Sequence, residues 1–335
     1  MPGGEHASKP YAWAGRFHLF HHIEKDLAEL EQEIHRVLHT EDPLLWEVST
    51  HLLRAGGKRL RPALLLTCAG FHRYDLRKLF PVAAAVELIH MATLVHDDVV
   101  DGSLVRRGLP TVNARWNQQV SILLGDYLFA RAFCLLSTEG DNFVVNTMAG
   151  VVLDMSRGEI EQTSKCYWLE LTEEDYFSRI GKKTAIFIAE CCALGAYLSG
   201  APAGETKALR EYGYCIGMGF QIIDDLLDLT ASEGKLGKPV GSDLRSGVLT
   251  LPVIHALRHS PGKERLREII SRKTMGEEEI QQVREILLRA GSLEYTYDVA
   301  SRMIGAARDW LQMLPLVPAR SALEEIADFI VRREF

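Results

Sequence analysis

The chain has 335 residues, of which 47% are hydrophobic and 25% are charged. This is the composition of a folded globular protein, and it excludes a chain that is disordered throughout. The formal net charge is −7. Without a basic excess, the protein is not expected to bind nucleic acid or an anionic membrane through a broad surface, so an anionic substrate would need a local cluster of cations.

The N-terminal residues, the cysteines and the apolar stretches limit the organisation further. Residues 1–20 mix Gly, Pro, Ala and charge without periodicity, so we expect a flexible tail followed by a single domain over 21–335. No apolar segment follows a basic start, which argues against a secretory signal. The six cysteines form no C-x-x-C pair, which favours free thiols in a reducing cytoplasm. The longest apolar stretches contain Glu87 and Glu190, so we expect no transmembrane segment.

The hydrophobic pattern is helical from about Phe20 onward. Apolar residues recur at spacings of three or four, as in Ile23, Leu27, Leu30 and Ile34. The same period predicts helices over 79–100, 120–136, 142–161, 176–198, 207–229, 250–258, 276–290 and 293–314. No segment has the alternation of paired strands. Several helices are apolar on more than one face, which is typical of the inner helices of a large all-α bundle.

Two short acidic motifs end apolar helical runs. Residues 97–101 read DDVVD and residues 224–228 read DDLLD. Residues three or four apart share a helix face, so the first and last carboxylates of each motif point the same way. Carboxylates this close repel each other, and several hard oxygen ligands favour Mg²⁺ together with substrate phosphates. A solvated helix end would explain one copy, but two copies with the same spacing predict a metal site.

Cations lie near these motifs in the sequence. Residues 56–62 read GGKRLRP, Arg106 and Arg107 follow the first acidic motif, and the pair 182–183 is Lys-Lys. Further lysines lie in the glycine-rich segment 231–247, which we interpret as a mobile lid. Each cation alone is most simply a solvated surface charge. Together with two metal-type motifs, they predict a site for two diphosphate groups, one held through Mg²⁺ and one held directly by Arg and Lys.

These motifs resemble those of a known family. HDDVVDGSLVRRG at 96–108 and GFQIIDDLLDLTASEGKLGKPVGSDL at 219–244 resemble the two aspartate-rich regions of the trans-isoprenyl diphosphate synthases. GGKRLRP at 56–62 resembles that family's isopentenyl diphosphate loop, and GKKT at 181–184 and TLP at 250–252 also fit. The motifs occur in the family's order. The resemblance implies an all-α, single-domain helical bundle of the isoprenoid synthase type with a central active-site cavity.

The resemblance also implies a reaction and a role for each matched residue. An allylic diphosphate, by expectation farnesyl diphosphate, would ionise, and isopentenyl diphosphate would add to the cation. Mg²⁺, expected as three ions per site when substrate is bound, would be held by Asp97, Asp98, Asp101, Asp224, Asp225 and Asp228. The two diphosphates would be bound by Lys58, Arg61, His90, Arg106, Arg107 and Lys238. The reacting carbons would be lined by Lys183, Thr184 and Gln221.

His90 lies in an apolar helical run. A lone histidine there is usually a hydrogen-bonded core residue. Only its position in the resemblance, seven residues before Asp97, assigns it to the substrate.

The residues one turn before the first acidic motif predict the length of the product. Ala92 and Thr93 stand where short-chain members of the family carry a bulky aromatic residue, and their small side chains leave the floor of the cavity open. One helical turn rises about 5.4 Å, so these two residues lie about that far below the acidic motif. The open floor predicts an all-trans product of about six to eight five-carbon units, with about seven favoured. Such a chain suits a quinone, by expectation menaquinone. Phe129, Phe133 or Met148 could still close the cavity lower down.

Three alternatives remain open from the sequence alone. A short-chain farnesyl or geranylgeranyl diphosphate synthase shares the same motifs. A class I terpene cyclase shares the first acidic motif, but its second metal motif normally mixes Asn or Asp, Ser or Thr, and Glu. A non-catalytic regulatory subunit often loses one acidic motif, whereas both are intact here.

Val248 departs from the pattern of many relatives, which have Lys at this position. One phosphate contact is therefore expected to be missing or supplied elsewhere. Some medium-chain synthases with a separate small subunit resemble this sequence there. The resemblance thus implies either a homodimer or a heterodimer with a small subunit, and the sequence does not choose between them.

Overall fold

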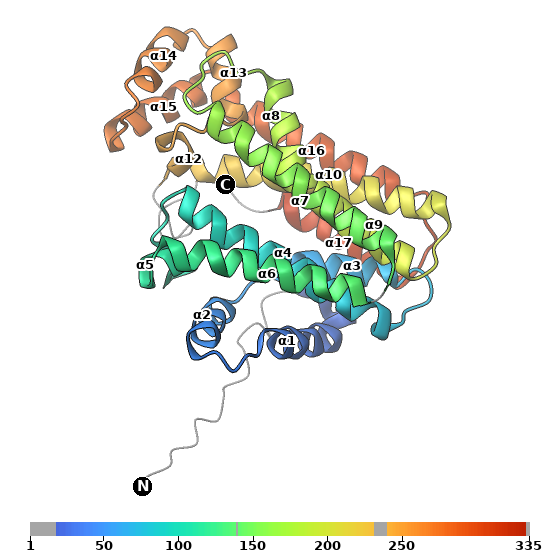
Figure 1. The fold of residues 1–335 in the computed structure, drawn as a ribbon. Helices are drawn as coiled ribbons and strands as arrows, with labels where there is room; N and C mark the ends of the chain where they lie inside the picture. Colours follow the sequence, from blue (N-terminus) through green and yellow to red (C-terminus); the bar gives the residue numbers. More distant parts are fainter. Residues whose placement is uncertain (1–17, 139, 231–239, 333–335) are drawn as a thin grey trace.

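The helical period of the sequence is confirmed, because long helices follow one another and pack side by side in one bundle (Figure 1). The structure is a computed structural model, and it describes residues 18–138, 140–230 and 240–332. Most of the predicted flexible tail lies outside these residues. The helices are η1 (His18–Ile23), α1 (Glu24–Leu38), α2 (Pro43–Arg54), α3 (Leu60–Ala69), α4 (Leu76–Val100), α5 (Val112–Arg115), α6 (Gln118–Thr138), α7 (Asn142–Ser164), α8 (Glu173–Ile180), η2 (Gly181–Ala185), α9 (Ile186–Leu198), α10 (Ala203–Thr230), α12 (Ser242–Arg245), α13 (Leu251–His259), α14 (Lys263–Ser271), α15 (Glu277–Arg289), α16 (Ser292–Leu311) and α17 (Pro318–Val331).

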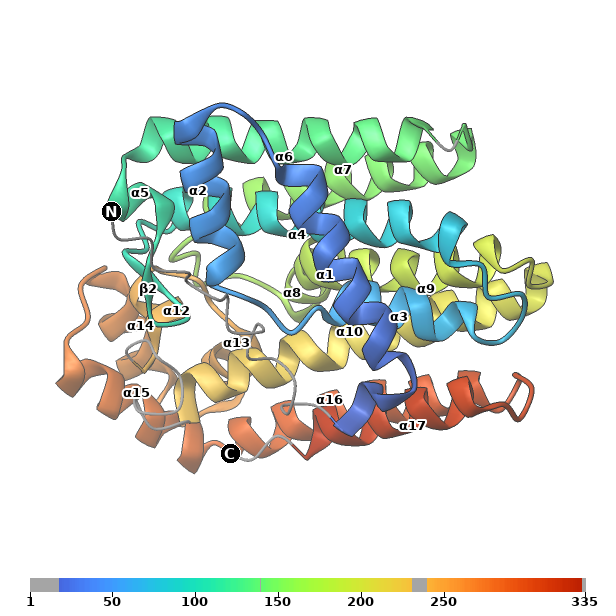
Figure 2. The same ribbon diagram turned by 90° about the horizontal axis from the view of Figure 1, so that it is seen from below.

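The two helices that carry the acidic motifs lie inside the bundle. Helix α4 packs against α1, α3, α6 and α9, and α10 packs against α9, α16 and α17. Figure 2 shows the same arrangement from below, with α1 and α2 on one side of the bundle and α16 and α17 along another. Because each inner helix has neighbours on several sides, it can bury apolar residues all round.

Helices α4 and α6 are both long and apolar enough to cross a membrane, by length and composition alone. In α4, 67% of the apolar window is buried inside the protein, which makes α4 a core helix. In α6 only 33% is buried. Helix α6 therefore presents an apolar face to the outside of the chain, which includes Ile122 and Leu123.

Two predicted helix boundaries are wrong in detail. Helix α4 begins at Leu76, ahead of the predicted start at residue 79, because Asp75 caps it by accepting a hydrogen bond from the Arg77 N–H at 3.2 Å. The run predicted as one helix over 176–198 is divided by η2, a π-helical turn. A π-helical turn contains one extra residue, which a period of 3.6 does not indicate, and such turns occur frequently at functional sites.

A short hairpin was also missed. Strands β1 (Val105–Arg106) and β2 (Leu109–Pro110) are antiparallel, and Val105 faces Pro110. The two turn residues, Arg107 and Gly108, have φ angles of 53° and 77°. Two successive left-handed residues form the turn that matches the twist of a hairpin, but Asn-Gly or Asp-Gly is its usual sequence signal. The turn sequence here is Arg-Gly and each strand has only two residues, so the sequence did not predict a hairpin.

Helices α3 and α9 approach so closely that a methyl group on Gly195 would lie 2.1 Å from the carbonyl oxygen of Leu65. We expect Gly195→Ala to force the two helices apart and to lower the free energy of unfolding by about 1–3 kcal/mol. Gly204 lies near the start of α10 with no atom within 4 Å of the added methyl. Gly204→Ala is the matched control and should be neutral or slightly stabilising. Urea unfolding followed by circular dichroism measures both, and equal stabilities would contradict this account.

Candidate active site

The C-terminal ends of α4 and α10 lie at the same end of the bundle, close to α5 and α12 (Figure 1). Two cavities open there, with volumes of about 530 Å³ and 740 Å³. They share five lining residues: Arg106, Arg107, Lys183, Thr184 and Gln221. The two cavities are therefore parts of one site, and this site lies where the acidic motifs end.

The first cavity is lined by both polar and apolar side chains. The polar lining includes Lys58, Arg61, His90, Asp97 and Asp224. The apolar lining includes Leu94, Phe129, Val152, Met155, Ile188 and Phe220. A cavity that offers both charged groups and hydrophobic surface suits a ligand that has an ionic head and a hydrocarbon chain.

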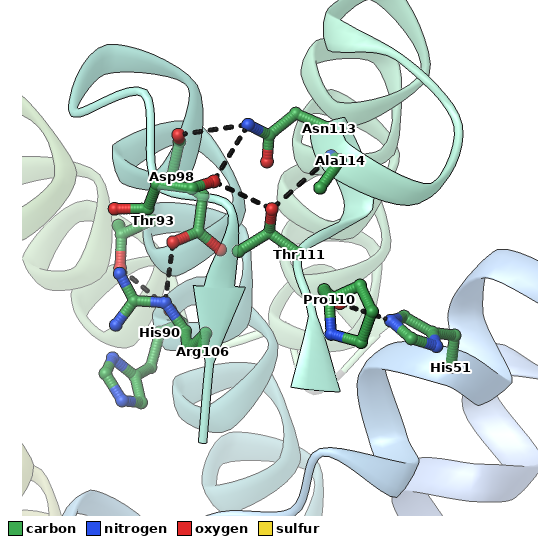
Figure 3. Close-up of polar contacts among 10 residues, drawn as sticks. His51, His90, Thr93, Asp98, Arg106, Pro110, Thr111, Asn113 and Ala114 are labelled. Carbon is green, nitrogen blue, oxygen red and sulfur yellow. Dashed lines mark hydrogen bonds and ion pairs between the residues drawn. The ribbon is translucent and has the colours of Figure 1, made fainter. Parts of the chain in front are cut away.

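In the first acidic motif, Asp97 lines the first cavity and Asp101 lines the second. Burial raises the pKa of Asp97 to about 6, and desolvation also raises the pKa of Asp101, although the charge of Lys183 opposes both shifts. Asp98 is turned elsewhere: it is buried, and its carboxylate accepts a hydrogen bond from Arg106 Nε at 2.7 Å (Figure 3). Spacing alone thus identified the two carboxylates that share a face.

In the second acidic motif, Asp224 lines the first cavity and Asp225 lines the second. Burial raises the pKa of Asp225 to about 7. The two oxygens of Asp225 accept hydrogen bonds from Tyr176 OH at 2.8 Å and from Gln221 Nε2 at 2.7 Å. Asp228 is buried, and it accepts a hydrogen bond from the backbone N–H of Asp243 at 3.2 Å.

Asp243 was missed by the sequence analysis. It lines the second cavity, and its negative charge contributes to the raised pKa values of Asp225 and Asp101. It belongs to α12, within the glycine-rich segment 231–247, so no helical spacing relates it to Asp228. Only the fold brings it to the acidic end of α10.

A divalent cation in these cavities would need oxygen ligands from a substrate or water as well as from the protein. Within the described parts of the chain, no three His, Cys, Asp or Glu side chains form a group that could hold a metal ion. Five aspartates nevertheless line the two cavities, Asp97 and Asp224 the first and Asp101, Asp225 and Asp243 the second. Hard carboxylate oxygens suit Mg²⁺, which takes one or two carboxylates and completes its shell with water and substrate phosphates. This donor set fits such an ion.

Among the cations of the site, Arg61 contacts a neutral partner and an aromatic one. Arg61 Nη1 lies 3.2 Å from His90 Nε2, and the Arg61 guanidinium lies 4.9 Å from the centre of the Phe187 ring. Burial and the nearby arginines hold the pKa of His90 well below its usual value. His90 is therefore a neutral acceptor for Arg61 as well as a lining residue. Lys238 lies outside the described residues.

The hairpin that carries Arg106 and Arg107 is fixed by polar contacts that the sequence analysis missed (Figure 3). Thr111 Oγ1 donates to the Ser103 carbonyl at 2.8 Å, and Asn113 Nδ2 donates to the same carbonyl at 3.0 Å. His51 Nε2 lies 2.8 Å from the Pro110 carbonyl oxygen and links the hairpin to α2. These contacts hold the two arginines beside the first acidic motif.

The π-helical turn η2 places the predicted reaction-centre residues. Lys183 forms an ion pair with Glu159 of α7, and Thr184 Oγ1 donates to Gln221 Oε1 at 2.8 Å. Gln221 in turn donates to Asp225, so a chain of hydrogen bonds runs from η2 into α10. The turn is packed closely, because a methyl group on Gly217 would lie 2.6 Å from the Ala185 Cα atom.

The residues expected to form the floor of the cavity differ in position, and Val248 lies at the second cavity. Thr93 lines the first cavity, whereas Ala92 is fully buried and is not among its lining residues. Phe129 also lines this cavity, and Phe133 and Met148 do not. Val248 lines the second cavity together with Arg179, whose buried guanidinium donates to the Leu249 carbonyl at 2.9 Å. A cation that the sequence analysis did not single out therefore lies near Val248.

Comparisons with known proteins agree with this site. Residues 42–287 match the family described as polyprenyl synthetase. The chain belongs to the polyprenyl synthetase family. It is 40% identical over 321 residues to the heptaprenyl diphosphate synthase component 2 of Geobacillus stearothermophilus, covering 95% of this chain and 98% of that protein. It is also 40% identical over 294 residues to a short chain isoprenyl diphosphate synthase of Methanothermobacter thermautotrophicus, covering 87% and 90%.

Solved structures of the polyprenyl synthetase family share the fold. A polyprenyl synthase from Caulobacter crescentus, complexed with calcium and isoprenyl diphosphate, superposes with a TM-score of 0.89 at 36% identity, covering 95% of this chain and 97% of that one. The all-α isoprenoid synthase fold is confirmed. This polyprenyl synthetase is an enzyme, a prenyltransferase, which disfavours the regulatory-subunit alternative.

Asp97 provides a test of the metal site, because it is a cavity carboxylate that is costly to keep ionised without a cation. We expect Mg²⁺ and inorganic diphosphate together to stabilise the protein by about 2.7 kcal/mol when free ligand is about 100 times its Kd. The shift in thermal midpoint should be smaller for Asp97→Asn. Asp309→Asn changes an exposed carboxylate on α16 and should respond like wild type. Equal shifts in all three proteins would contradict the role of Asp97.

Proposed function

We propose that this polyprenyl synthetase is a Mg²⁺-dependent enzyme that adds isopentenyl diphosphate to an allylic diphosphate, with farnesyl diphosphate as the primer. The observation that carries this proposal is the first cavity, whose lining combines cations and carboxylates with large apolar side chains. A prenyl diphosphate likewise combines an ionic head with a hydrocarbon chain. A class I terpene cyclase is disfavoured by the family match and by the GGKRLRP loop, which brings Lys58 and Arg61 to the cavity.

The reaction that we propose is balanced by its own substrates. The C–O bond of the allylic diphosphate breaks, and its electron pair leaves with the diphosphate. The double bond of isopentenyl diphosphate forms a new C–C bond to the cation, and a carbon-bound proton passes to the released diphosphate. Mg²⁺, when bound, would neutralise negative charge on the leaving group, and Asp97, Asp101, Asp224 and Asp243 are the residues that would hold it.

The remaining residues bind, orient and exclude water. Lys58, Arg61 and Arg107 would hold the diphosphate of isopentenyl diphosphate, and Arg106, fixed on Asp98, would meet the allylic diphosphate. Thr184 and Gln221, joined by a hydrogen bond, would present oxygen dipoles to the developing cation. Met155, Ile188 and Phe220 would keep the hydrocarbon chain away from water. Lys183 would exchange its ion pair with Glu159 for a substrate oxygen.

We further propose a heptaprenyl product for a quinone side chain, by preference menaquinone. Relatives of equal identity carry the names heptaprenyl and short chain, so the family alone leaves the product length open. The choice rests on Thr93, a small residue in the wall of the first cavity one turn before Asp97.

We also propose that the enzyme works in the cytoplasm and associates through the outer face of α6 and α7. Several large apolar side chains are exposed on these helices: Ile122, Leu123, Phe143, Leu153 and Ile160. An exposed apolar area of this kind marks an interface. The relative from Geobacillus stearothermophilus is named component 2 of its synthase. This name supports a small partner subunit as the alternative to a second copy of this chain.

The first experiment is a product assay with the purified protein alone. With Mg²⁺, labelled isopentenyl diphosphate and farnesyl diphosphate, we expect a product of about thirty-five carbons, and Asp97→Asn should lower turnover by about 10²-fold or more. Light scattering on the same sample measures the oligomeric state. If the folded protein binds Mg²⁺ and diphosphate but makes no product, the proposal that this chain is active without a partner is wrong.

Thr93 offers a separate test of product length. Thr93→Phe places a ring in the wall of the first cavity and should shorten the product by about one to three five-carbon units, because the close-packed surroundings leave no other space for it. Thr93→Val keeps the shape and loses only the hydrogen bond to the His90 carbonyl. It should leave the product unchanged. If the two variants and wild type gave products of one length, Thr93 would not limit the chain.

A further inference from the structure

Arg59 lies in sequence between two proposed substrate ligands, Lys58 and Arg61, but its side chain has other partners. It is only 7% exposed. Its Nε and Nη2 donate to the two carboxylate oxygens of Glu31 at 2.8 Å and 2.7 Å, and its Nη1 donates to Glu87 Oε1 at 2.6 Å. Glu31 belongs to α1 and Glu87 to α4, and both are buried. The guanidinium thus joins two helices through a three-residue ion network.

The backbone of Arg59 is left-handed, with a φ of 48°. A residue other than glycine adopts this conformation at a cost in free energy, and it persists where the surroundings determine it. Arg59 is also the N-cap of α3, and its side chain makes no capping hydrogen bond. The ion network is the interaction that can hold this strained residue at the point where the loop turns into α3.

Two members of the network, Arg59 and Glu87, also line the first cavity next to Lys58 and Arg61. Glu87 is 2% exposed and gives one oxygen to Arg59, while its Oε2 has no hydrogen-bond partner among the described residues. Its negative charge favours the charged forms of Arg61 and Arg107, whose pKa values burial lowers. Gly57 leaves space for this cluster, because a methyl group there would lie 2.9 Å from Arg107 Nη1 and 3.1 Å from Arg59 Nη1.

We infer that Arg59 is a positioning residue: bound to Glu31 and Glu87, it holds the left-handed turn that brings Lys58 and Arg61 to the diphosphate, and it does not bind the diphosphate itself. This inference rests on the proposed function, in which those two residues bind isopentenyl diphosphate. It has a consequence for α1. Glu31 precedes the region 42–287 that matches the family, so diphosphate affinity depends on a helix outside that region.

The experiment compares Arg59→Gly, Arg59→Lys and Glu31→Gln with wild type. Glycine removes the backbone strain together with the guanidinium, lysine keeps the charge but cannot bind both carboxylates in the same way, and glutamine weakens the contact with α1 alone. We expect KM for isopentenyl diphosphate to rise by about tenfold or more in Arg59→Gly and less in the other two, with KM for the allylic diphosphate changed by less than about twofold.

Two controls separate positioning from stability. Glu33→Gln, also on α1, breaks an exposed pair with Arg36 and should change neither KM. Leu266→Ala truncates a fully buried side chain in α14, away from the loop, and should lower the thermal midpoint without a selective change in KM. If the Arg59 variants lost stability but showed no larger rise in KM for isopentenyl diphosphate than Leu266→Ala, the network would be structural only and the inference would be wrong.

Calorimetry with inorganic diphosphate makes the result independent of catalysis. Weaker binding in Arg59→Gly than in Leu266→Ala supports the inference even if wild type transfers no prenyl group, an outcome that would count against the proposed function alone. Equal binding in these two variants would overturn the inference, whatever the activity of wild type.

Discussion

The site depends on holding like charges close together in a space that is partly closed to water. Carboxylates at the ends of α4 and α10 face the same two cavities as five shared polar or cationic residues. Burial makes each charge costly, which is why the pKa values of Asp97 and Asp225 are raised. The protein offsets part of this cost with internal pairs, such as Arg106 with Asp98 and Lys183 with Glu159. The part of this cost that internal pairs do not offset would be relieved when a divalent cation and diphosphates bind.

Several backbone irregularities occur where a side chain must enter this space. Arg59 and Arg107 are left-handed residues other than glycine, and η2 adds a residue to a helical turn just before α9. Each irregularity is held by neighbours, through the ion network of Arg59, the hydrogen bonds of the hairpin and the close contact of Gly217 with Ala185. A bundle of regular helices supplies the rigid frame, and these few exceptions direct functional groups into the cavity.

The first cavity is lined by two kinds of side chain, and in the proposed function they have different tasks. The charged residues, which lie in the family motifs, would bind the diphosphates and carry the reaction. Side chains such as Thr93, Phe129 and Met155 would meet the hydrocarbon chain, and their size could change without disturbing the ionic chemistry. Overall identity is therefore a poor measure of product length, as relatives of equal identity with different names illustrate.

The sequence by itself determined the all-α class, most of the long helices and the spacing of the carboxylates in the two acidic motifs. These are local properties, because hydrophobic period and i, i+4 spacing are set by residues within a few turns of each other. It placed Asp97 and Asp101 on one helix face, but it could not show that Asp98 binds Arg106. Nor could it find Asp243, Glu159 or the partners of Arg59. Those assignments belong to the tertiary structure, because each depends on contacts between helices that are distant in the chain, where no periodicity relates one residue to the other.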